Sequence, residues 1–462
     1  MAGRTLRWVA RQLAPMSDSS LGLTTAVAIA LGGMVGGGIY AVLGVVAQVT
    51  GPATWAAFTL AGVVALCAAY SYNALNRLSD DHGGSVTFVE AFTGSPTAAG
   101  MVGWTLLFGY IGSMAMYGFA FAEFTVAFDA VPGTLAGLPT RPLISVAAIG
   151  AFVGLNLVGA RSSGSAEIAL VIGKIAILLA FGLLGVWYAT GGGGPALTFG
   201  AGRLTSAGPI VAAAISFVAF QGWQLLFYDQ DTIADPVETI RKSVYIAIPA
   251  ALVVYVLVGV VTVALAPEAL KSHPHVALKD AASRMAAPFG LGAAGATLVA
   301  LSALFSTGSA INATLFSAAH FAKGMLSDDL LPDRIGDGDS DGVPPRTVLV
   351  LGAITAAFAA VGSLGAITSF ASLSFIVVFG LMSVLAFRQR DEDAVNPVPP
   401  AIGAVGAGAF LPLMAWNLSQ REPTTFQLVV VLSVAILVVE LLYFERETVE
   451  EGVVAVEKRL AD

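Results

Sequence analysis

Apolar runs of about 20 residues recur from Leu21 to Tyr443, and each is long enough to cross a hydrocarbon core about 30 Å thick. The runs lack the strict alternation of membrane β-strands and are rich in the small residues that closely packed membrane helices use. Because 56% of the residues are apolar and only 11% are charged, the chain could not cover a water-soluble surface of ordinary charge density. The sequence therefore predicts an all-α integral membrane protein.

Hydropathy, with Gly, Pro and charged residues as boundaries, divides the chain into about twelve transmembrane helices. We expect them at residues 21–49, 53–75, 97–128, 143–158, 166–190, 210–233, 244–265, 288–322, 347–361, 364–387, 400–416 and 426–444. Most of the 22 Lys and Arg residues then fall on the side of the N-terminus, and basic loops are retained in the cytoplasm. This predicts a multi-pass protein of the cell membrane with both termini cytoplasmic.

Two of these spans carry an interruption at corresponding places, residues 32–38 in the first and 220–224 in the sixth. Broken helices in equivalent positions are typical of transporters built from two inverted repeats. The alternative for the first interruption is that Gly32 and Gly36 form a close-packing face. The alternative for the second interruption is a polar patch that faces another helix. We therefore expect an inverted repeat of five plus five helices with broken helices one and six, followed by two extra helices. The predicted divisions are 1–20 (cytoplasmic segment), 21–190 and 207–388 (the repeats), 398–444 (helices eleven and twelve) and 445–462 (cytoplasmic tail).

A helix broken at the membrane midplane exposes N–H groups at one new end and C=O groups at the other, and an amino acid zwitterion can satisfy both. We expect the N–H groups near Gly36 to hold a carboxylate and the carbonyls near Gln221 to hold an ammonium group. Trp223 and Phe220 could close over the solute and Gln224 could contact its side chain, although such aromatic residues can equally pack between helices. The predicted substrate-binding residues are Gly33, Met34, Gly36, Gly37, Gly38, Phe220, Gln221, Gly222, Trp223 and Gln224.

Lys174 lies in an otherwise uncharged span, where a buried ammonium group costs roughly 2.5 to 3.5 kcal/mol or more. Such a cost favours a functional role. The alternative is that the side chain reaches back to the membrane surface, but the helix start at Ala166 is about 12 Å away, at about 1.5 Å per residue, and a Lys side chain bridges that only in part.

Several motifs resemble those of the amino acid, polyamine and organocation transporter superfamily. Gly33 stands where Ser is common in the first motif, Val86 replaces an aromatic residue in the second, and the loop after the sixth span departs from the family pattern. The motifs are residues 32–40, 83–94, 217–223 and 327–332.

This resemblance implies amino acid transport by an inverted-repeat permease. In proton-coupled members, a Lys on the fifth helix occupies the place of a sodium ion in sodium-coupled relatives, and Lys174 between Gly173 and Ile175 matches that setting. Ser306 and Thr307 of the eighth span are its expected neighbours by the same resemblance. Hydroxyl groups in membrane helices, however, usually bond to their own backbone.

The sequence and the resemblance together predict a secondary active transporter of small neutral amino acids, coupled to protons, that works by alternating access. Alternatives are sodium-coupled transport or exchange of amino acids or amines, or a transporter-like amino acid sensor. We expect no enzyme activity, no cofactor and no metal site. The formal net charge of −8 excludes a nucleic-acid partner, so the expected partners are the substrate, protons or sodium, and the lipid bilayer.

Overall fold

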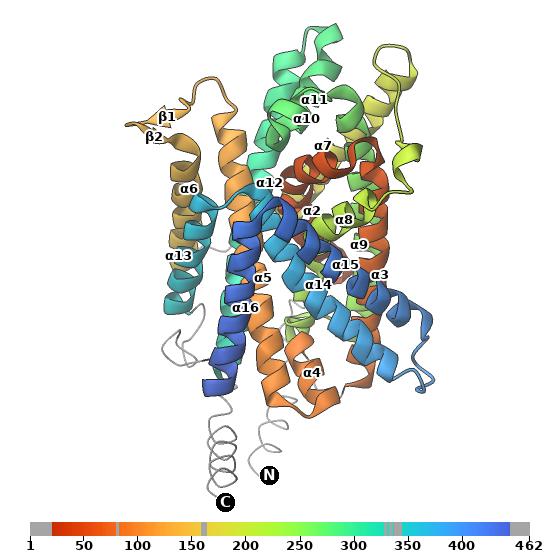
Figure 1. Ribbon diagram of the computed structural model, residues 1–462, viewed down its shortest axis with the longest axis vertical. Helices are drawn as coiled ribbons and strands as arrows, with labels where there is room; N and C mark the ends of the chain where they lie inside the picture. The colour runs from red at the N-terminus through yellow and green to blue at the C-terminus, as the bar shows by residue number, and fades with distance from the viewer. Residues whose placement is uncertain are drawn as a thin grey trace, which may run out of the picture.

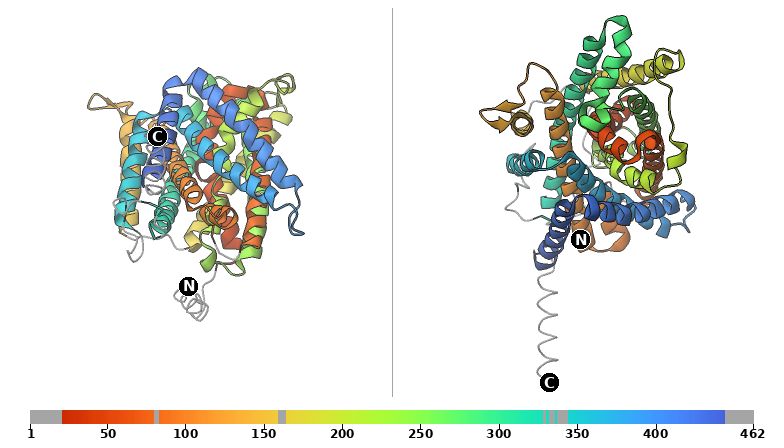
Figure 2. Two further views of the ribbon diagram at one scale, coloured as in Figure 1. Left: turned by 60° about the horizontal axis from the view of Figure 1, so that its bottom comes forward. Right: turned by 45° about the horizontal axis from the view of Figure 1, so that its top comes forward.

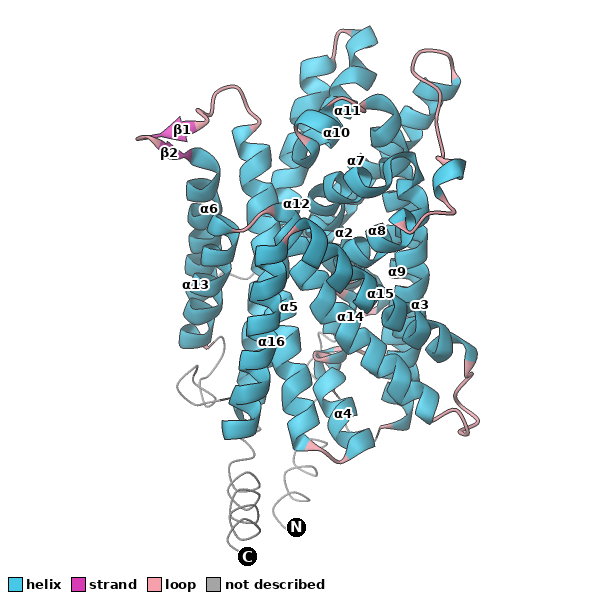
Figure 3. Cartoon of the chain, viewed as in Figure 1, coloured by secondary structure: helices cyan, strands magenta, loops and turns pink. Residues whose placement is uncertain are grey.

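The computed structural model describes residues 21–79, 83–158, 164–327, 330–331, 336 and 344–443. The predicted segments 1–20 and 445–462, and half of the motif at 327–332, lie outside these residues. Almost all of the described chain is helical, apart from a small antiparallel hairpin of β1 (Thr134–Leu135) and β2 (Leu138–Pro139) (Figure 3).

Among the described residues, eleven long helices and the short helix α8 correspond to the twelve predicted spans. They are α2 (Leu23–Thr50), α3 (Thr54–Leu78), α5 (Pro96–Val126), α6 (Thr140–Leu157), α7 (Gly164–Thr190), α8 (Gly208–Ser216), α9 (Pro236–Leu265), α12 (Gly292–Ser327), α13 (Pro345–Val361), α14 (Leu364–Arg388), α15 (Val398–Arg421) and α16 (Pro423–Tyr443). Among the described residues, eight stretches are long and apolar enough to cross a membrane, the first of which contains both α2 and α3, and three shorter apolar helices add to them. The chain is an all-α, multi-pass membrane protein.

Three short helices lie outside the spans. They are α4 (Ser85–Thr93), α10 (Ala269–Ser272) and α11 (Ala277–Ala286). Figure 1 shows α4 at one end of the molecule and α10 and α11 at the other. The connections that hold them therefore lie on opposite sides of the membrane, as the predicted order of spans requires.

The helix α2 lies inside the bundle and packs against α5, α7, α8, α9 and α12. Figure 2 shows it surrounded by other helices when the end that carries α10 and α11 faces the viewer. By contrast, α6 and α13 pack on each other at one edge of the molecule (Figure 1). The last two helices add to the outside, with α15 against α14 and α3, and α16 against α15 and α5.

Contacts between the helices of the two predicted repeats occur in matched pairs. Equivalent helices pack together, with α3 on α9, α5 on α12 and α6 on α13. Contacts between non-equivalent helices also have counterparts: α2 on α9 matches α3 on α8, α5 on α14 matches α12 on α7, and α5 on α13 matches α12 on α6. Several contacts between the halves thus have counterparts, whereas the contact of α2 with α12 has no comparable equivalent between the described residues of α8 and α5.

The two predicted interruptions differ. The sixth span is broken, because α8 ends at Ser216 and gives way to 3₁₀ turns at Phe217–Phe220 and Trp223–Phe227. The first span is not broken, since α2 runs as a helix from Leu23–Thr50 through the glycine cluster. The prediction of a broken first helix is therefore wrong.

Candidate functional site

The break in the sixth span lies directly on α2. Gln221 is extended, with φ −89° and ψ 159°, and Gly222 has φ 123°, a conformation that L side chains rarely adopt. A Cβ atom built on Gly222 would lie 2.8 Å from the Cα atom of Gly33, and one built on Gly33 would lie 2.9 Å from the Cα atom of Gly222. Glycine is required at both positions because the two backbones touch.

The remaining glycines of α2 serve as packing positions. A Cβ atom on Gly36 would lie 2.7 Å from the Cβ atom of Ala310 on α12, and one on Gly38 would lie 2.9 Å from the hydroxyl of Tyr255 on α9. One on Gly37 would overlap the ring of Tyr117 on α5. Close approach of three helices explains why so many glycines occur without a break. The free N–H groups expected near Gly36 do not arise from an interruption, and substrate binding there stays a prediction.

Side chains from three other helices instead bond to the carbonyl groups of α2. Lys174 Nζ donates to Gly32 O at 3.0 Å, Tyr255 Oη donates to Met34 O at 2.7 Å, and Ser306 Oγ donates to Val35 O at 3.0 Å. These acceptors lie within one turn of α2, beside Gly33. The structure thus brings α7, α9 and α12 together at the point where the broken span meets α2.

Lys174 is only 6% exposed, which agrees with the predicted burial. Of its two predicted neighbours, Ser306 reaches the same turn of α2, whereas Thr307 Oγ1 donates to Ala303 O of its own helix at 2.7 Å. The structure therefore brings Lys174 and Ser306 to one segment and leaves Thr307 out of it.

A buried hydrogen-bond network lines the break. Gln221 Nε2 donates to Tyr117 Oη at 2.6 Å, the Gly222 backbone N–H donates to Gln224 Oε1 at 2.6 Å, and Gln224 Nε2 donates to Gln221 Oε1 at 3.3 Å. Tyr117 comes from α5 and was not among the predicted site residues. Sequence analysis missed both Tyr117 and Tyr255, because a lone Tyr in an apolar span carries no signal of which backbone it will reach.

Trp223 is fully buried in a cluster of aromatic rings. Its ring centroid lies 5.0 Å from that of Phe379, 5.1 Å from Tyr72 and 6.2 Å from Phe227, and its Nε1 has no hydrogen-bond partner among the described residues. Phe220 packs on Tyr255 with centroids 5.2 Å apart. Both predicted aromatic residues thus lie at the break, Trp223 on one side of Gln221 and Phe220 on the other.

The segments around the break are also joined at one end of the molecule. The Leu21 N–H donates to Thr232 O at 2.8 Å, and the Ala234 N–H donates to Leu21 O at 3.1 Å. These bonds form an isolated parallel β-bridge between Leu21, just before α2, and Ile233, after the break in the sixth span.

Comparison with known proteins places this arrangement in a family. The model of the amino acid permease family matches residues 21–440. The chain belongs to this family. The match confirms the resemblance drawn from the motifs and shows a membrane transporter.

The permease is similar to several known transporters. It is 28% identical to the inner membrane transport protein YbaT of Escherichia coli, over 81% of this chain and 85% of that protein. It is 24% identical to the methylthioribose transporter of Bacillus subtilis, over 83% and 85% of the two chains. It is 26% identical to the mouse cationic amino acid transporter 4, over 85% of this chain and 62% of the mouse protein.

Two cavities of the permease lie beside the sixth span, one reaching Leu225 of its second 3₁₀ turn and the other reaching Ile215 of α8. One, of about 190 Å³, is lined by Tyr228, Asp229 and His320, among others, from the segment after the break and from α12. The other, of about 230 Å³, lies where α2 and α15 end and α14 begins. Among the described residues no group of His, Cys, Asp and Glu could hold a metal ion, and His273 lies 2.9 Å from Asp280 in an ion-pair contact.

Proposed function

We propose that this permease is a secondary active transporter of small neutral amino acids, coupled to protons through Lys174. The observation that carries the proposal is the hydrogen bond of the buried Lys174 ammonium group to Gly32 O at 3.0 Å. A protonated Lys holds α2 through a charge-assisted bond, and loss of the proton removes the charge from that bond. Proton occupancy then biases the position of α2, which is the link that a proton-driven transporter needs.

The chemistry around the break favours a neutral substrate. Tyr117, Gln221, Gln224 and Trp223 lie at the break and carry no charge, and the cation nearest to it is Lys174, so a substrate with a cationic side chain would be buried there without a partner. The names of the mouse and Bacillus relatives refer to cationic amino acids and to methylthioribose, so family membership leaves the substrate open.

Alternating access in this proposal follows from two inverted repeats, residues 21–190 and 207–388. The matched contacts between the two halves support such a repeat, because a twofold relation between the halves generates each contact twice. A closed middle with one cavity toward each end fits a transporter that opens to one side at a time. In this proposal the permease lies in the cell membrane, and the ends of the chain and α4 face the cytoplasm.

Uptake by the purified protein in liposomes tests the proposal. Labelled glycine, alanine, serine, leucine, lysine and methylthioribose are offered while pH and sodium gradients are imposed separately. Accumulation of a neutral amino acid under a pH gradient alone is the expected result. Accumulation that follows sodium and ignores pH would overturn proton coupling. Movement that requires an amino acid on the opposite side would identify an exchanger.

A further inference from the structure

The cavity at the end that carries α10 and α11 reaches the last turn of α8 at Ile215, but it is not lined by any residue from 217 to 227. It has a volume of about 230 Å³ and lies between the last turns of α2 and α15, the first turns of α14 and the turn at Pro274–Val276. Val45, which lines it, follows Gly38 by seven positions, or about 10 Å along a helix. A solute in this cavity would not touch the Gly33–Gly222 contact.

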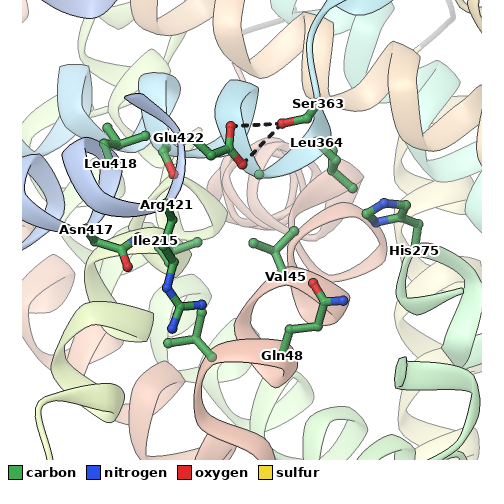
Figure 4. Close-up of a pocket in the computed structure, with 13 residues that line it drawn as sticks. Val45, Gln48, Ile215, His275, Ser363, Leu364, Asn417, Leu418, Arg421 and Glu422 are labelled. Carbon is green, nitrogen blue, oxygen red and sulfur yellow. Dashed lines mark hydrogen bonds between the residues drawn. The ribbon is translucent and has the colours of Figure 1, made fainter. Parts of the chain in front are cut away.

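Arg421 is the cation of this cavity. It is the last residue of α15, it is exposed, and its side chain extends toward Gln48 on the far wall (Figure 4). Its guanidinium group forms no ion pair or hydrogen bond with another residue of the described chain. An unpaired guanidinium offers a carboxylate two parallel donors.

Glu422 supplies the opposite charge. Its side chain points away from that of Arg421, toward the start of α14 (Figure 4). The carboxylate accepts from Ser363 Oγ at 3.1 and 3.3 Å and from Thr425 Oγ1 at 3.1 Å, and no Lys or Arg of the described residues pairs with it. Ser363 caps α14, whose N-terminus favours a negative charge. Hydroxyl groups therefore hold the carboxylate in place, but no cationic side chain of the described residues pairs with it.

The neighbouring residue His275 does not change this charge balance at neutral pH. Burial, and then the charge of Arg141, lowers the pKa of His275 below its usual value, so the ring is neutral near pH 7. One cation and one anion thus face the same cavity from adjacent residues without pairing with each other.

We propose that this cavity is a second amino acid site, in which Arg421 and Gln48 bind the carboxylate and Glu422 binds the ammonium group of the zwitterion. Such a site would hold a second substrate molecule while the break is closed. The proposal takes its ligand class from the proposed function, but its test needs no transport. The ligand must carry both a carboxylate and an ammonium group, because a ligand with only one of them would leave either Arg421 or Glu422 unpaired.

Cysteine labelling in detergent solution tests this site without reference to membrane orientation. Cys67 is the one cysteine of the chain, so Cys67→Ser gives a clean background. Asn417→Cys places a thiol in the cavity wall, and Ser272→Cys places one on an exposed turn outside it as the control. The rate of reaction with aminoethyl methanethiosulfonate is measured with and without a mixture of glycine, alanine, serine and leucine.

The mixture should slow labelling of Cys at position 417 and leave position 272 unaffected. Arg421→Ala and Glu422→Gln should each raise the half-protecting concentration roughly tenfold, or about 1.4 kcal/mol. In the Gln221→Ala variant, which changes the break, the mixture should still protect Cys at position 417. If Gln221→Ala does not fold, Tyr117→Phe is used in its place. No protection of position 417 would overturn the proposal. So would protection by acetate or ethylamine alone, or protection that the Gln221→Ala variant loses. Protection without any uptake in liposomes would instead count against the proposed transport function alone.

Discussion

Gly37 faces the ring of Tyr117 with no room for a side chain between them. Tyr117 in turn accepts the amide of Gln221, so the glycine on α2 controls the position of a side chain at the break. Glycine at this position therefore serves close packing beside the site. Its role differs from that of Gly222, where a φ of 123° adds a conformational requirement.

We expect Gly37→Val to abolish transport while the protein still inserts in the membrane. The branched side chain must displace Tyr117 and break its bond to Gln221, at an overpacking cost of about 1–3 kcal/mol. Uptake in liposomes and the thermal midpoint in detergent measure the two effects. The matched control is Gly150→Val on α6, where a new Cβ atom meets nothing within 4 Å. Equal transport by the two variants would remove Gly37 from the site.

Trp223→Ala should weaken apparent substrate affinity more than Trp223→Phe does. The indole fills a space between Tyr72, Phe227 and Phe379, and loss of a buried Trp costs about 3–5 kcal/mol of packing. Its Nε1 has no partner, so Phe loses no hydrogen bond and keeps most of the contact area. The KM for uptake, with expression as the control, checks this prediction. Equal KM values for the two variants would mean that Trp223 only packs.

At the scale of elements, hydropathy located the spans well because length and apolar content decide whether a helix can cross a membrane. Predicted spans at 97–128 and 364–387 correspond to α5 (Pro96–Val126) and α14 (Leu364–Arg388). Short helices escaped this reasoning. Helix α11 carries Lys279, Asp280 and Arg284 and was placed in a loop, because a short polar segment has no hydropathy signal.

The two interruptions show where local sequence stops being sufficient. A glycine cluster lowers helix propensity, yet α2 stays helical because α5, α9 and α12 pack against its glycines and use the space that they leave. A single glycine at Gly222 marks the true break, since its backbone rests on Gly33 of another span. Such a contact depends on tertiary structure and cannot be derived from one span. That Ser306 lies near Lys174 was expected only through the family resemblance.

The fifth helix of each half binds the first helix of that half through one polar side chain. Lys174 of α7 donates to Gly32 O of α2. Ser372 of α14 donates to Ile215 O at 2.7 Å and accepts from the Val218 N–H at 3.1 Å, where α8 ends. Lys174 in the first half is ionisable, whereas Ser372 in the second half is neutral. Of these two equivalent hydrogen bonds, only the one from Lys174 can respond to a proton.

We expect Ser372→Ala to lower the thermal midpoint and slow transport, since the buried Val218 N–H would lose its acceptor at a cost of about 1–3 kcal/mol. Ser374→Ala on the same helix is the matched control, because Ser374 Oγ bonds only to Phe370 O of its own helix, at 3.4 Å. Thermal unfolding in detergent and initial uptake rates compare the two variants. A similar effect of both would mean that the end of α8 does not depend on this bond.

At the scale of the whole molecule, the broken span is in backbone contact with α2, and a cavity lies toward each end of the bundle, one toward α4 and the other toward α10 and α11. In the proposed mechanism, opening either end would move α2 and the broken span relative to α5, α12 and α14. The hydrogen bond from Lys174 joins α7 to α2. In the proposed mechanism, a protonated Lys174 would resist this motion and a deprotonated Lys174 would permit it.

Lys174→Ala is therefore expected to abolish accumulation driven by a pH gradient while counterflow of the same amino acid continues. Accumulation needs the proton to bias the two arrangements of α2, whereas counterflow needs only substrate binding and movement between them. Both are measured with labelled substrate in liposomes, and Ser306→Ala is the comparison variant, because Ser306 bonds to Val35 O in the same turn but cannot carry a proton charge. That variant should slow both processes and keep the pH dependence. Full pH-driven accumulation by Lys174→Ala would leave Lys174 as a structural residue that only fixes α7 to α2.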